Sequence, residues 1–256
     1  MKKKNLTLIL RLVILHFKNL YAGTRLGFIW IITGPLLMLS LYSLTYSVVY
    51  KVVLPDYSVL EYIINVFAGI ILLLSVMSAI SNSCQLLKRD GRLRNLGLTI
   101  YDIPLKAALV EIVPFLISLV LLFILSAFNL RSLASLPYFL LYLIVFFLFV
   151  LGLIRILSVV GVLFKDFQFI IPYIGIALLL VTPISYLPSM IPDSYKVLFR
   201  VNPLYYLCTT LQTISVKGSL PLSDFAISTL IVSALYFVSI YFYRKSIPLI
   251  IDSINS

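Results

Sequence analysis

The sequence predicts an all-α integral membrane protein with six transmembrane helices, and three observations indicate this class. Hydrophobic residues make up 62% of the 256 residues, against roughly 45–50% in soluble domains. Charged residues make up 11%, against roughly 25% in soluble domains, which is too few to cover a water-soluble fold. Long stretches carry no charge at all, and their continuous apolar character favours helices over barrel strands. We treat residues 1–256 as one transmembrane domain.

The uncharged stretches define the expected spans, because a bilayer core of about 30 Å needs about 20 helical residues. We expect membrane helices at about 28–51, 61–83, 105–128, 137–164, 168–187 and 225–244. Ahead of the first span, Lys4, Arg11 and Lys18 recur every seven residues and share one helical stripe. Leu8 and Leu12 point elsewhere. Segment 1–24 is therefore predicted to be an amphipathic interface helix on the membrane surface, with a frayed basic tail as the alternative.

The basic residues predict the orientation of the chain. Of the 20 Lys and Arg residues, fourteen fall on the side that carries both chain ends, five fall on the other side, and Arg155 lies within a span. Because cytoplasmic loops carry an excess of Lys and Arg, we expect a multi-pass protein of the cytoplasmic (inner) membrane with both termini inside the cell. This distribution also accounts for the net charge of +11 without a nucleic-acid partner.

No sequence motif indicates catalysis. The chain has neither a phosphate-binding loop nor a G-x-S-x-G elbow. His16 is the single histidine, and Cys84 and Cys208 are expected on opposite sides of the membrane. We therefore expect no catalytic residue, no metal site and no cofactor bound by this chain, which is not an enzyme by itself. If ATP powers its activity, another polypeptide binds the nucleotide.

The external segment 188–224 combines four prolines with an uncharged run at 201–216 that is too short to cross a bilayer comfortably. This composition predicts short re-entrant helices in the outer leaflet, where irregular backbone must be buried in protein or face a water-filled cavity. An ordinary surface loop is the alternative. We expect this segment to form an external gate that includes Pro192, Asn202, Pro203, Tyr205 and Tyr206.

Four motifs in register with the spans resemble those of polysaccharide-exporting ABC-2 permeases. They are residues 21–30 (YAGTRLGFIW) continuing to 34–37 (GPLL), 163–166 (LFKD), 182–184 (TPI) and 201–204 (VNPL). The chain is most similar to the O-antigen (Wzm-type) transmembrane subunits, and teichoic acid and capsule exporters share these motifs. One departure concerns the second cytoplasmic segment. Relatives often carry Phe-Pro there, where this chain has Asp90 and Gly91.

The resemblance implies a homodimer that exports a lipid-linked polysaccharide through a shared pore, with ATP and Mg bound by two partner subunits. Cytoplasmic segment 84–104 would supply the helix that couples it to the ATPase. Within residues 85–98, leucines that could enter a partner's pocket alternate with charges for its rim. The expected coupling residues are Leu86, Leu87, Lys88, Arg89, Arg92, Leu93 and Arg94. The alternative is an electrostatic anchor on anionic lipid heads.

Tyr42, Tyr46 and Tyr50 repeat every four residues and form one stripe on the first span. Tyrosine offers a flat face and one hydroxyl, which suits sugar rings with apolar faces and hydroxyl rims. We expect the stripe to line the glycan path with weak, repeated sites. An interfacial aromatic belt combined with helix packing is the alternative.

Arg155 lies well inside a predicted span, away from its ends, where an unpaired charge is costly. Glu111 lies at a comparable depth, so we expect an intramembrane ion pair between these two residues. The alternative places Arg155 in a cytoplasmic vestibule that attracts the phosphates of a lipid-linked substrate. Two other function classes stay open, a secondary transporter and a membrane-embedded lipid-modifying enzyme. An internal repeat or a catalytic motif would favour them.

Overall fold

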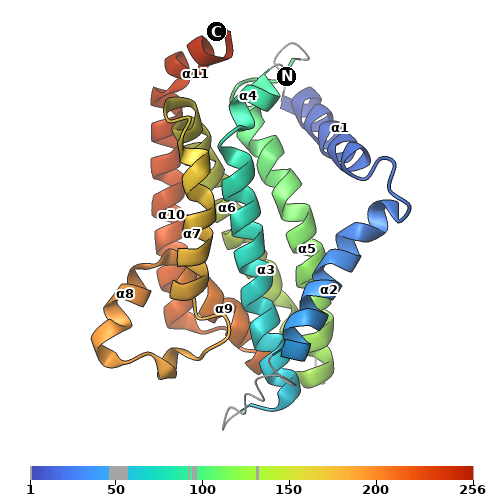
Figure 1. Ribbon diagram of the computed structural model, residues 1–256, viewed down its shortest axis with the longest axis vertical. Helices are drawn as coiled ribbons and strands as arrows, with labels where there is room; N and C mark the ends of the chain where they lie inside the picture. The colour runs from blue at the N-terminus through green and yellow to red at the C-terminus, as the bar shows by residue number, and fades with distance from the viewer. Residues whose placement is uncertain (1, 46–56, 92, 94–96, 131–132, 256) are drawn as a thin grey trace.

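The computed structural model of the protein describes residues 2–45, 57–91, 93, 97–130 and 133–255, and the regular structure within these ranges is helical. The helices are α1 (Lys2–Leu20), η1 (Gly27–Ile29), α2 (Trp30–Leu44), α3 (Val59–Ser83), α4 (Leu86–Asp90), α5 (Asp102–Leu130), α6 (Leu136–Leu163), α7 (Phe167–Val181), η4 (Pro188–Met190), η5 (Asp193–Tyr195), α8 (Lys196–Val201), α9 (Pro203–Lys217), α10 (Leu222–Lys245) and α11 (Ile247–Asn255). Figure 1 shows a bundle with both chain ends, α4 and α11 at one end, here called the terminal end. α8 and α9 lie at the opposite, distal end.

The all-helical class is confirmed, and each predicted span coincides with an apolar helix. α3, α5, α6 and α10 are long and apolar enough to cross a membrane. α2 and α7 have 15 residues each, or about 22 Å of helix, and residues 46–51 of the first predicted span lie outside the described residues. α7 ends at Val181, short of the predicted residue 187. The residue before a proline disfavours helical backbone, and Thr182, before Pro183, is extended (φ −102°, ψ 130°).

α3 occupies the centre of the bundle. Its most apolar stretch is 67% buried, against 17% for α10, which lies at the periphery. α2, α5, α6, α7 and α9 all pack on α3. Its start is fixed by a capping box, in which Ser58 Oγ accepts from the Glu61 N–H and the Glu61 carboxylate accepts from the Ser58 N–H. The outer helices expose large apolar side chains such as Phe128 and Leu230, so a lipid environment suits them.

The amphipathic segment at the amino terminus forms α1, which packs on protein along one face. Ile9, Val13 and Phe17 follow one another at four-residue intervals and are buried against side chains of α5. Leu6 and Ile14 stay exposed beside this face, and contact with lipid there remains a prediction. The chain then bends sharply into α2, because Gly23 and Gly27 both have positive φ (79° and 52°), a conformation that favours glycine.

α6 approaches the connection between α3 and α4 at Gly161. The carbonyl group of Cys84 lies so close to this glycine that a methyl group in its place would overlap it. The short connection between α3 and α4 is thereby pressed against α6. This contact positions α4 relative to the bundle.

The substitution Gly161→Ala should therefore lower the free energy of unfolding by about 1–3 kcal/mol, the usual effect of overpacking a tight core. Thermal unfolding of the full chain in detergent micelles measures this change. Gly34→Ala is the matched control, since a methyl group there meets nothing within 4 Å. A Gly161→Ala variant as stable as the Gly34→Ala variant would contradict the close approach.

Candidate functional site

The predicted coupling segment forms the short helix α4 at the terminal end (Figure 1). Leu86 and Leu87 are 0% and 1% exposed and belong to the main core of this chain. The expectation that they enter a partner's pocket is therefore wrong: α4 has five residues, and its apolar side faces its own bundle. Lys88 and Arg89 are exposed. These two basic side chains are the part of α4 that a partner protein can reach.

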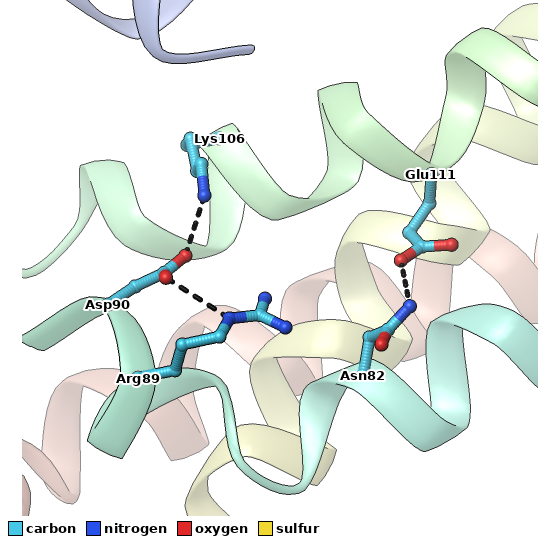
Figure 2. A network of polar contacts seen from close by, with 5 residues as sticks. All are labelled: Asn82, Arg89, Asp90, Lys106 and Glu111. Carbon is cyan, nitrogen blue, oxygen red and sulfur yellow. Dashed lines mark hydrogen bonds and ion pairs between the residues drawn. The ribbon is translucent and has the colours of Figure 1, made fainter. Parts of the chain in front are cut away.

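A buried ion pair anchors α4 to α5. Lys106 Nζ donates to Asp90 Oδ2 at 2.8 Å, and Arg89 Nε donates to Asp90 Oδ1 at 3.2 Å (Figure 2). The Asp90 and Lys106 side chains are 8% and 6% exposed, so water screens their attraction weakly. Asp90 therefore supplies the carboxylate that fixes α4 to the bundle.

The structure describes only some residues of the rest of the coupling segment. Leu93 is half-buried and Leu98 is buried, and both pack with the α1 residues Ile9, Val13 and Phe17. Arg92 and Arg94 lie outside the described residues. The coupling segment and α1 are therefore in direct contact through apolar side chains.

A groove of about 280 Å³, here called the inner groove, lies between α2, α3 and α5. It is lined by Gly34, Pro35, Met38, Phe67, Ile70, Ile71, Leu74, Ser75, Ser78, Glu111, Pro114 and Ser118. Most of the wall is apolar. Its serine hydroxyls and one carboxylate are spread along α3 and α5, so the groove offers isolated polar contacts within an otherwise apolar surface.

Glu111 lies in the inner groove and takes a partner different from the expected one. Its side chain accepts a hydrogen bond from Asn82 Nδ2 at 2.7 Å (Figure 2). The predicted ion pair with Arg155 is not formed between these two described residues. The guanidinium Cζ of Arg155 instead lies 4.9 Å from the ring centroid of Tyr236. Glu111 and Arg155 lie at similar depths along their helices, but Glu111 faces α3 and Arg155 faces α10.

Tyr42 is the described member of the predicted tyrosine stripe. It is half-buried, packs against the main core and lies one helical turn beyond Met38, which lines the inner groove. Its place on α2 continues the groove face. Tyr46 and Tyr50 lie outside the described residues, so their part in a glycan path stays a prediction.

The predicted gate segment contains a buried helix rather than an exposed loop. Eleven of the 15 residues of α9 are buried, which makes it part of the bundle core. Asn202 and Tyr205 are buried, Pro203 and Tyr206 are half-buried, and Pro192 is exposed. The segment therefore combines a fixed helix, α9, with the more exposed α8, and its gating role stays a prediction.

A polar network joins α9 to the end of α7. Asn202 Nδ2 donates to Thr182 Oγ1 at 3.0 Å, while Asn202 Oδ1 caps α9 by accepting from the Leu204 N–H. Gln212 Nε2 lies 2.8 Å from the Pro183 carbonyl oxygen. The two sequence motifs at 182–184 and 201–204 are thus in contact. The side chains of Asn202 and Gln212 satisfy backbone groups that the breaks at Pro183 and Pro203 leave without helical partners.

Sequence reasoning missed three features of these sites. The first is the polar stripe of Ser75, Ser78 and Asn82, whose spacing of three and four residues within an apolar span could have identified it. The second is the Asp90–Lys106 pair, which joins residues 16 positions apart and has no local signal. The third is Gln212, a polar residue within an uncharged run.

A comparison with known families gives a match. The profile of a family described as ABC-2 type transporter matches residues 7–215, from α1 to α9. This match spans most of the 256-residue chain. No curated protein matches the chain.

Removal of the buried carboxylate should release α4. Asp90→Asn leaves the Lys106 charge buried without its partner, which we expect to reduce the free energy of unfolding by about 3–5 kcal/mol. Replacing both members, with Asp90→Leu and Lys106→Met, should restore most of that loss because no unpaired charge remains. Chemical denaturation in micelles measures both variants. Equal loss in the single and double variants would refute the pair.

The docking of α1 should depend on pH through His16. Burial, then the charges of Lys106 and Arg89, lower the pKa of His16, and Asp90 partly offsets them. The unfolded chain therefore binds the proton more readily. Docking is fully stable above the unfolded pKa of about 6.5 and weakens as the pH falls below it. Hydrogen-exchange protection of residues 9–17 measures this. The His16→Gln variant should lose the dependence, and an unchanged dependence would contradict this role.

Proposed function

Because the chain belongs to the ABC-2 type transporter family, we propose that it is the export channel of a lipid-linked polysaccharide. It is a multi-pass membrane subunit of an ABC transporter, a class that normally works with a separate ATP-binding subunit. In this proposal two copies of the chain form the path and two ATP-binding subunits hold ATP and Mg. The terminal end then faces the cytoplasm of the cell, as the distribution of basic residues indicates.

The inner groove is the observation that carries the polysaccharide proposal. Sugar rings present apolar faces and hydroxyl rims, and the groove presents apolar side chains with isolated hydroxyl groups. Pro35 and Pro114 also line the groove, and each removes one backbone hydrogen-bond donor from its helix. Such weak, distributed contacts suit a polymer that must slide. Tyr42 would extend this surface along α2.

The terminal end supplies the surface for the ATP-binding partner. Lys88 and Arg89 project from α4, which the Asp90–Lys106 pair holds in place. A rigid helix with exposed charges can transmit force from a partner, whereas a loose loop cannot. In this proposal the charges contact the partner directly, and the leucines of α4 act by fixing the helix to the bundle. The lipid-head anchor on the same charges acts alongside this role.

The distal end supplies the external gate in this proposal. α9 is fixed by the contacts of Asn202 and Gln212, so movement is expected in the exposed segment before it. α8 exposes Val197, Leu198 and Val201 by 61–75%, and these apolar side chains fit an outer-leaflet environment. Lys196 and Arg200 lie on the same short helix, so in this proposal their charges would contact lipid headgroups.

Substitution in the inner groove tests the proposed path. The double change Ser75→Leu and Ser78→Leu should lower glycan export by about tenfold or more, the effect of losing about 1.4 kcal/mol of polar contact. Transport of labelled lipid-linked glycan into vesicles measures it. ATP hydrolysis by the assembled complex should persist, since α4 is unchanged.

Ser81→Leu is the matched control, because Ser81 is exposed on the same helix outside the lining of the inner groove. Wild-type export by the double variant, at equal membrane abundance, would exclude the groove as the path. If the double variant instead reduced the export of a different polymer, the groove would remain the path and only the proposed substrate would change.

A further inference from the structure

A second cavity, of about 310 Å³, lies at the terminal end of the bundle and has no lining residue in common with the inner groove. It is formed where Tyr101, the residue just before α5, meets the last third of α6 and the second half of α10. Its lining residues are Tyr101, Arg155, Tyr236, Ile240, Tyr243 and Arg244. We call it the arginine pocket.

The arginine pocket is positively charged. Two of its six lining residues are arginines and none is acidic. Arg155 Nη1 is buried without a hydrogen-bond partner, and neither Arg155 nor Arg244 forms an ion pair within the described part of the chain. A buried guanidinium donor without an acceptor is costly. The contact with the Tyr236 ring offsets part of that cost but leaves the Nη1 donor unused.

One wall of the pocket is fixed by a hydrogen bond, and the lining carries donors that suit an anion. The Tyr243 hydroxyl donates to the Ile100 carbonyl oxygen at 2.8 Å, which ties α10 to the residues that precede α5. Tyr101 packs on this wall, with a ring-centroid distance of 6.4 Å to Tyr243. Its side chain is 51% exposed. Guanidinium groups beside a tyrosine hydroxyl form a donor set that suits the oxygens of a phosphate ester.

The depth of the pocket matches a lipid headgroup. Arg244 is the next-to-last residue of α10. Arg155 lies eight residues before the end of α6, or about 12 Å along the helix. A guanidinium at that depth can reach toward the interface along its own side chain. With the terminal end at a membrane surface, as the basic residues predict, the pocket would span the region where the phosphates of that leaflet lie.

An exposed apolar stripe begins beside the pocket. Leu230, Phe237 and Tyr241 are 71%, 68% and 69% exposed and share one face of α10, next to Arg244. This stripe runs from the pocket toward the middle of the bundle. It has the direction that an acyl chain takes below its headgroup.

From these observations we propose that the arginine pocket binds the phosphate of an anionic membrane phospholipid, with an acyl chain along α10. Arg155 and Arg244 contact the phosphate, and the Tyr101 hydroxyl adds a donor at the mouth. The lipid would join α5, α6 and α10 at the terminal end. This inference stands apart from the export path and holds whatever the protein transports.

Native mass spectrometry of the full chain, purified in neutral detergent, tests the site. Phosphatidylglycerol should bind the wild type, and Arg244→Gln should weaken binding about tenfold, the loss of one charge-assisted hydrogen bond. Arg244 is the main target because it is exposed at a helix end. Tyr101→Phe should weaken binding less. Lys245→Gln, which changes an exposed neighbour outside the pocket, should leave it unchanged.

Two further ligands separate the possible sources of the phosphate. A diacylglycerol glycolipid without phosphate and soluble glycerol 3-phosphate should both bind far more weakly than phosphatidylglycerol. Equal binding of the glycolipid would overturn the phosphate contact. Equal binding of glycerol 3-phosphate would overturn the lipid assignment, and equal loss in Arg244→Gln and Lys245→Gln would reduce the site to general surface charge.

Discussion

A polar group inside this bundle is costly unless it finds a partner within the protein, because lipid offers no hydrogen bonds. Gln212 and Asn202 meet this requirement at the distal end, where they reach the backbone and side chain at the break after α7. Asp90 and Lys106 meet it at the terminal end. These two networks fix α9 and α4 to the central helices, so both ends of the bundle are held while the inner groove lies between them.

The contacts also suggest how the terminal end and the groove are connected. The coupling segment packs on α1 through Leu93 and Leu98, and α1 leads through the bend at Gly23 and Gly27 into α2. α2 forms one wall of the inner groove. Packed side chains and one bend thus connect the coupling segment to the groove wall. In the proposed function, this connection would carry a displacement of the coupling segment to the groove.

Much of the fold could be predicted because a helix in lipid must be apolar along its length. Each span therefore leaves a long uncharged run in the sequence. Apolar runs located α2, α3, α5, α6, α7 and α10, and heptad spacing located α1. Side-chain partners were less predictable, since a run of leucines does not reveal which face meets protein. Leu86 and Leu87 look like docking residues in sequence but fill the core. Arg155 and Glu111 match in depth but differ in rotation about their helices. The Asp90–Lys106 pair depends on a tertiary contact that carries no periodic signal.

The most direct test of the central claim is transport in vesicles that contain the purified chain, with and without its co-purified ATP-binding subunit. We predict that lipid-linked glycan crosses the bilayer only when the subunit, ATP and Mg are all present. Charge reversal at Lys88 and Arg89 should abolish the ATP-dependent transport. Export by the chain alone, or an unaltered response after charge reversal, would contradict the account.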